Sequence, residues 1–116
     1  MGPRLTEAAV EKRLREAVRG GHVVIRQRPL RAAVAQVDVN NHPHLILLDP
    51  LRGALMDSLI HELVHVVYLR EVEMWGQLEE AVVEAIEEGI VRYINRSRGR
   101  VEWWRKQIDA ALEADA

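Results

Sequence analysis

The chain has no cysteine among its 116 residues, which excludes both a disulfide framework and a cysteine-ligated zinc site. Any bound metal would therefore be held by histidine and carboxylate side chains. The chain also has no apolar run long enough to cross a bilayer, and residues 1–6 lack the apolar core of a signal peptide. We therefore expect a cytoplasmic protein with no membrane partner.

The chain also lacks a large excess of either positive or negative charge, because its formal net charge is only -2 at pH 7. This balance does not indicate a polyanionic partner, so nucleic-acid binding is not expected. With 116 residues, 48% of them hydrophobic, the chain can bury one core but not two. We expect a single domain over residues 1–116.

The N-terminal half predicts one helix followed by three strands. Thr6 can cap a first helix that ends at the glycine pair 20–21. Strands are predicted at 22–27, at 33–40, where apolar and polar residues alternate, and at 44–48, a continuous apolar run typical of an inner strand.

The C-terminal half predicts three helices. Asp49-Pro50 is a helix-start signal, so a helix is predicted over 51–69. A further helix is predicted over 77–95, and a last one after residues 97–99. The apolar stripe expected on the helix 77–95 consists of Leu78, Val82, Ala85, Ile86, Gly89, Ile90 and Tyr93. The expected fold class is α+β, with a small three-stranded sheet packed on the first helix and on the helix 51–69.

His61-Glu62-Leu63-Val64-His65 is an HExxH motif within the helix 51–69. Residues four apart share one face of a helix, so both imidazoles can reach a single Zn²⁺ and Glu62 can reach a water bound to it. The simpler interpretation is a pair of hydrogen-bonded core histidines beside a solvated glutamate. Burying these groups together costs free energy unless each finds a partner, and a zinc ion supplies that partner.

A third zinc ligand must come from another element, since catalytic zinc usually has three protein ligands and one open position. Asp57, one turn before His61, can accept a hydrogen bond from it but is not a suitable ligand. The candidate ligands on the helix 77–95 are Glu79, Glu80, Glu84, Glu87 and Glu88. If Val82 is the centre of the buried stripe, Glu80 and Glu84 form a carboxylate pair on one face, which could supply a ligand and an acceptor for a zinc-bound histidine.

The combination of HExxH and a downstream glutamate helix resembles the gluzincin metallopeptidases, whose best-known member is thermolysin. Glu80-Ala81-Val82-Val83-Glu84-Ala85-Ile86 is similar to the family pattern around its glutamate ligand. The small size and the order of one helix and three strands also resemble the minimal gluzincins and related small cytoplasmic HExxH domains, over about residues 5–95. The resemblance implies a zincin-like metallopeptidase domain in which His61, His65 and Glu80 bind zinc. Glu62 would be the catalytic base, and Glu84 the acceptor for a zinc-bound histidine.

Spacing from the motif leaves the ligand assignment open to alternatives. The separation of Glu84 from His65 matches the aminopeptidase branch of the family better, so Glu84 is the alternative ligand, followed by Glu79. The family also implies a peptide or protein substrate that pairs with an edge strand, for which the segment 33–40 is expected. The candidate donors for the oxyanion of the transition state are Tyr68, Tyr93, His42 and His44.

Two other functions remain open. One is a non-catalytic regulatory or binding domain that keeps zinc for folding. The other is a nucleic-acid-binding module built on a basic C-terminal stretch that contains Arg92, Arg96, Arg98, Arg100, Trp103, Trp104, Arg105 and Lys106. The simpler interpretation of this stretch is a solvated helix end with Trp104 in the core. Trp103 lies off the apolar face, where it could be exposed, cover the cleft or form a homodimer contact.

Overall fold

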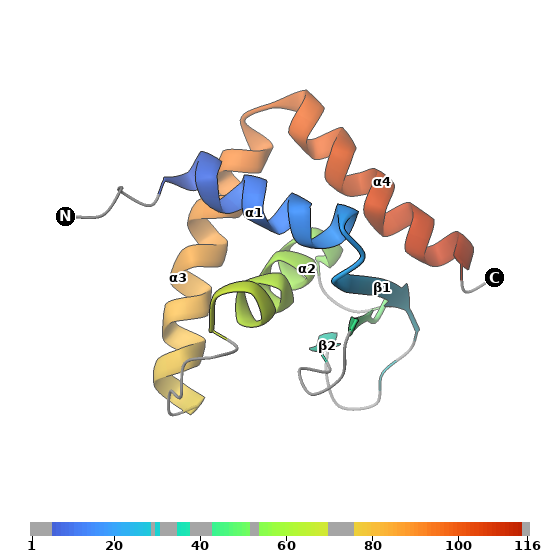
Figure 1. Ribbon diagram of the computed structural model, residues 1–116, viewed down its shortest axis with the longest axis horizontal. Coiled ribbons are helices and arrows are strands. Elements are labelled where there is room, and N and C mark those ends of the chain that lie inside the picture. The colour runs from blue at the N-terminus through green and yellow to red at the C-terminus, as the bar shows by residue number, and fades with distance from the viewer. Residues whose placement is uncertain are drawn as a thin grey trace.

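The computed structural model describes residues 6–28, 30, 35–37, 43–51, 54–69 and 76–114 (Figure 1). The elements in chain order are α1 (Glu7–Arg19), β1 (Val23–Gln27), β2 (Ala35–Val37), β3 (His44–Leu48), α2 (Leu55–Val64), the π-helix η1 (His65–Leu69), α3 (Gly76–Asn95) and α4 (Arg98–Ala114). The predicted α+β class is confirmed. No helix within the described residues is both long and apolar enough to span a membrane.

Helix α1 begins and ends as its sequence predicts. The Thr6 hydroxyl accepts a hydrogen bond from the backbone N–H of Ala9 at 3.1 Å, which satisfies one of the free amides of the first turn. At the other end Gly21 has φ 74°, a left-handed conformation that glycine adopts without steric cost. The chain then turns directly into β1.

The sheet has the order β1-β3-β2. Strands β1 and β3 pair in parallel, from Val23 opposite His44 to Gln27 opposite Leu48, and the short β2 pairs antiparallel with the other side of β3. Ile46 and Leu48 of β3 are fully buried, and the Gln27 amide donates to the Ile108 carbonyl at 2.7 Å. The rest of the predicted strand 33–40 and the turn that follows it lie outside the described residues.

The predicted start of the motif helix is wrong. The buried Asp49 carboxylate accepts from the backbone N–H of Leu51 at 2.9 Å and from that of Leu30 at 3.0 Å, so it stabilises the loop after β3. Helix α2 begins only at Leu55, after Ala54, which has no capping side chain. The sequence correctly indicated that the Asp49 side chain accepts hydrogen bonds from backbone amides. These amides, however, belong to the turn after β3 and to a distant segment, and not to the first turn of a helix.

The C-terminal helices complete the core around α2. Leu59, Ile60, Leu63 and Val64 of α2 are fully buried, and α2 packs against α3, α4, β2 and β3. On α4, Trp104, Ile108 and Ala111 are buried, so Trp104 lies in the core as the sequence suggested. Trp103 is half-buried against Trp104 and lies under the guanidinium groups of α1, at 4.6 Å for Arg15 and 5.3 Å for Arg19.

The buried stripe of α3 differs from the predicted one by a rotation of the helix. Val83, Ile90 and Ile94 are buried, whereas Ala85 is exposed and Val82 is only half-buried. The centre of the stripe is therefore Val83 and not Val82. One residue corresponds to a rotation of about 100° around a helix, so this difference changes which glutamates face α2.

Candidate metal centre

Two imidazoles lie beside each other on the less buried side of the motif helix, with His61 in α2 and His65 at the start of η1. The rings of His61 and His65 lie 5.0 Å apart between centroids, in an edge-to-face arrangement, as residues one helical turn apart should. The fully buried apolar side chains of α2 fix the rotation of the helix, so both imidazoles are half-buried and point toward the N-terminal part of α3.

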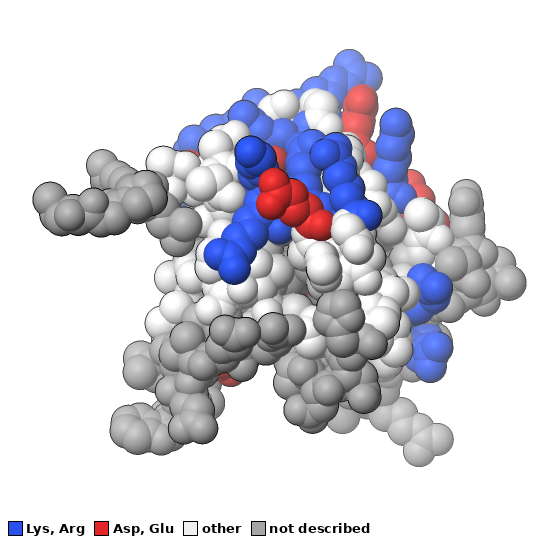
Figure 2. Space-filling model, in the orientation of Figure 1, with Lys and Arg blue, Asp and Glu red and all other residues white. Residues whose placement is uncertain are grey.

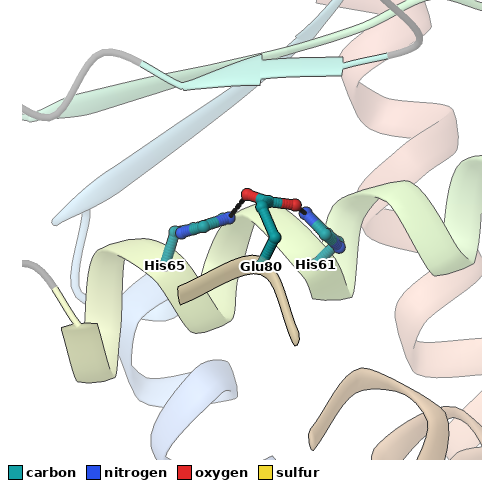
Figure 3. Close-up of side chains that lie close together, drawn as sticks. All are labelled: His61, His65 and Glu80. Carbon is teal, nitrogen blue, oxygen red and sulfur yellow. Dashed lines mark ion pairs between the residues drawn. The ribbon is translucent and has the colours of Figure 1, made fainter. Parts of the chain in front are cut away.

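A single carboxylate joins the two imidazoles. The Oε2 atom of Glu80 lies 3.1 Å from Nε2 of His61, and its Oε1 atom lies 2.8 Å from Nε2 of His65 (Figure 3). One ligand atom from each of the three residues lies within 4.8 Å of the others. The structure thus brings together the three side chains that the resemblance assigned as zinc ligands.

Glu80 reaches the histidines because of the register of α3. With Val83 at the centre of the buried face, helical geometry puts Glu79, Glu80 and Glu87 within about 60° of that centre. Glu84 falls about 100° away and is exposed. Glu84 is therefore not part of the cluster, and neither its assignment as acceptor nor its alternative assignment as ligand holds.

The other nitrogen of each imidazole faces a different carboxylate of α3. Nδ1 of His61 lies 2.7 Å from Oε1 of Glu87, within hydrogen-bonding distance, and Nδ1 of His65 lies 3.5 Å from Oε2 of Glu79. The hydrogen-bond partner observed for His61 is thus Glu87, where the sequence suggested Asp57 or Glu84. The signal available in the sequence was the seven-residue interval between Glu80 and Glu87, which keeps both on one helix face.

Two groups, the His61 imidazole and the Glu62 carboxyl, have a raised pKa. Burial lowers the pKa of His61, but the hydrogen bond that its ring donates to Glu87 and the charges of Glu80, Glu62 and Glu87 outweigh it, so the net pKa lies above the ordinary histidine value. Burial is the main cause that raises the pKa of the Glu62 carboxyl, and the histidines oppose it. His61, His65, Glu80 and Glu87 all contribute to the pKa of the Glu62 carboxyl, the two histidines lowering it and the two glutamates raising it.

The donor set suits zinc. Two imidazole nitrogens and one carboxylate oxygen are ligands that zinc accepts, and two ligands on a tetrahedral zinc lie about 3.3 Å apart. The observed separations of 3.1 and 2.8 Å are slightly shorter than this, and the three ligand atoms all lie within 4.8 Å of one another. Without a metal, the same atoms form an ion-pair network that links α2 and α3, and metal binding has to be separated from this simpler role by experiment.

A donor for the transition-state oxyanion is not apparent among the described candidates. Tyr68 lies in η1 with its ring 4.9 Å below the Arg13 guanidinium of α1. Tyr93 is thirteen residues beyond Glu80, about 20 Å along the helix, and stacks with Arg100. His44 is buried at the start of β3, and His42 lies outside the described residues.

The sheet lies over the cluster. Strand β2 packs against α2, and the close-up shows it passing above the side of α2 that carries His61 and His65 (Figure 3). The side of β2 that faces away from β3 has no partner strand in the described part of the chain.

Part of the basic C-terminal stretch is engaged in contacts within the protein, and Arg96, Arg105 and Lys106 are exposed. Arg92 pairs with Glu88 at 3.6 Å, Arg98 pairs with Glu102 at 3.1 Å, and the Trp104 ring is fully buried. Lysines and arginines are spread over α1 and α4 on the face shown in Figure 2, with acidic side chains between them. These contacts favour the interpretation of a solvated helix end.

Comparisons of the chain with protein-family models, curated proteins and solved structures find no match.

Proposed function

We propose that this protein is a zinc-dependent peptidase of the minimal gluzincin type, with its sheet packed on α1 and on the HExxH helix. The observation that carries the proposal is the Glu80 carboxylate, which bridges the Nε2 atoms of both motif histidines from a separate helix. An HExxH motif that arose by chance has no reason to meet a third ligand at a common point. The motif and this contact together support a metal site of catalytic type.

Each residue of the cluster has a distinct role in this proposal. His61, His65 and Glu80 would hold the ion. A zinc ion held by these residues would supply Lewis acidity, both toward a water molecule and toward the carbonyl of the scissile peptide bond. Glu62 accepts the proton of the attacking water and returns it to the leaving amine. Its burial raises its pKa, which makes the carboxylate a better proton acceptor than a solvated glutamate.

Strand β2 is the proposed guide for the substrate. A peptide in extended conformation would pair with the free side of residues 35–37, and this would lay its backbone across the metal centre. Recognition through main-chain hydrogen bonds does not depend on the side chains of the substrate. We therefore expect extended peptides or unfolded protein segments as substrates.

The competing function is a non-catalytic domain that keeps zinc for stability or binding. The two proposals share the three ligands and differ at Glu62, because a purely structural site has no use for a general base beside the ion. The partly buried Glu62, which follows His61 directly in the motif and whose pKa responds to both histidines, favours catalysis.

The test is the variant Glu62→Gln, with Glu84→Gln as a matched control on the exposed side of α3. Peptide cleavage is measured with a diverse peptide library, and zinc content by elemental analysis. Glu62→Gln should retain zinc and lose cleavage, while Glu84→Gln should keep both. Loss of zinc from Glu62→Gln would mean that Glu62 is a ligand. A zinc-loaded wild type that cleaves nothing in the library would favour the non-catalytic domain.

A further inference from the structure

Helix α3 contacts both imidazoles at both of their nitrogens. Glu80 meets the two Nε2 atoms, Glu87 meets Nδ1 of His61, and Glu79 meets Nδ1 of His65. Glu79 and Glu87 are 28% and 22% exposed, so both are more shielded from solvent than Glu80, which is 50% exposed. These two carboxylates are not needed as ligands, and their contacts require another explanation.

We propose that Glu87 and Glu79 are positioning residues, which hold the two imidazoles with Nε2 directed at the metal, and that Glu87 is the dominant one. This inference rests on the metal site of the proposed function. The acidic residue four positions after Glu80 is the exposed Glu84, so this chain orients its histidines from different positions of the helix than the gluzincin pattern suggested.

The physical reason is the tautomer of the imidazole. A histidine whose Nδ1–H donates to a carboxylate keeps the lone pair on Nε2, and the hydrogen bond fixes the plane of the ring. Without that acceptor the ring can rotate and the proton can occupy either nitrogen. The imidazole then has to be reoriented each time a metal binds, and this lowers the affinity of the site for the metal.

The two contacts are unequal, and this gives the inference a specific prediction. The 2.7 Å contact of Glu87 has the length of a charge-assisted hydrogen bond, whereas the 3.5 Å contact of Glu79 lies beyond the usual range. Loss of an acceptor for a metal-bound histidine typically lowers metal affinity about 10- to 100-fold. We expect a loss of this size for Glu87 and a smaller loss for Glu79.

The experiment measures zinc dissociation constants by competition with a chromophoric chelator. The variants are Glu87→Ala, Glu87→Gln and Glu79→Ala, and the controls are Glu84→Ala and Glu88→Ala, which remove one carboxylate from exposed positions of the same helix. Glu87→Gln keeps an oxygen that can accept from Nδ1, so it should recover part of the affinity lost in Glu87→Ala.

Long-range ¹H–¹⁵N spectra of the zinc-loaded protein should show the His61 proton on Nδ1 in wild type, with a shifted resonance in Glu87→Ala. Melting curves of the metal-free variants show whether each remains folded.

Zinc affinity in Glu87→Ala equal to that of Glu84→Ala would overturn the inference, and a larger loss in Glu79→Ala would overturn the assignment of Glu87 as dominant. Failure of the proposed function has a different signature. In that case the wild type binds zinc, the Glu87 variants bind it more weakly, and no peptide is cleaved. A wild type that binds no zinc contradicts both.

Discussion

The Oε1 atom of Glu80 lies 2.8 Å from Nε2 of His65 and connects α3 to the HExxH helix. These two residues are separated in the chain by the fourteen residues 66–79, and α2 and α3 also pack against each other through buried apolar side chains. A zinc ion bound between them would act as a brace between two helices.

Removal of zinc should therefore lower the melting temperature by several degrees, because a ligand bound only by the native state adds stability by mass action. Wholesale unfolding is not expected, since apolar residues of all four helices and of the sheet form one buried core that contains no metal ligand. Thermal melts with and without chelator check this. Complete unfolding of the metal-free protein would favour a structural zinc site, and identical melts would mean that packing alone holds the helices.

Metal content should follow the three proposed ligands. The purified protein should contain about one zinc per chain, and His61→Ala, His65→Ala and Glu80→Ala should each lose most of it. Glu84→Ala is the matched control, because it removes the same group from an exposed position one turn along the helix. Loss of zinc from the Glu84 variant with retention in Glu80→Ala would reverse the ligand assignment.

The pH dependence of stability should have opposite signs with and without zinc. The pKa of His61 in the folded, metal-free protein lies above the ordinary value of 6.5, so the stability contributed by protonated His61 is complete below that value and is lost as pH rises through the raised pKa. Zinc competes with this proton and binds more tightly as pH rises. The difference in melting temperature between zinc-loaded and metal-free protein should widen from about pH 6 to about pH 8. A difference that narrows over this range would contradict the proton competition.

The core should depend more on Trp104 than on its neighbour Trp103. Trp104 is fully buried, and its Nε1–H lies 3.4 Å from the buried Glu11 carboxylate, so Trp104→Ala should cost about 3–5 kcal/mol of unfolding free energy. Trp103→Ala removes a half-buried ring and its contacts with two arginines, and its cost should be clearly smaller. Urea denaturation of both variants compares them, and equal costs would show that the arginine-covered ring is as much a part of the core.

Local features of the protein could be predicted from the sequence because they depend on neighbouring residues. The spacing of His61 and His65 places both imidazoles on one helix face wherever the helix packs. Thr6 caps the helix that follows it, since its hydroxyl needs only the amide three residues ahead. The continuous apolar run 44–48 predicted the strand β3 with the correct bounds.

The features that could not be predicted from the sequence depend on contacts between segments that are distant along the chain. Asp49 is a residue type that often caps a helix. Its carboxylate instead accepts a hydrogen bond from the amide of Leu30, nineteen residues earlier, and the helix begins only at Leu55. The sequence offered five glutamates of α3 as candidate zinc ligands. Which of them meet the histidines depends on which side of the helix packs inward. That side is centred on Val83, one residue from the predicted centre, and the resulting rotation of about 100° brings Glu80 and Glu87 to His61 and leaves Glu84 in solvent. A helical stripe with apolar residues on several adjacent positions can be buried in more than one rotation with similar local free energy, and only packing against α2 selects one.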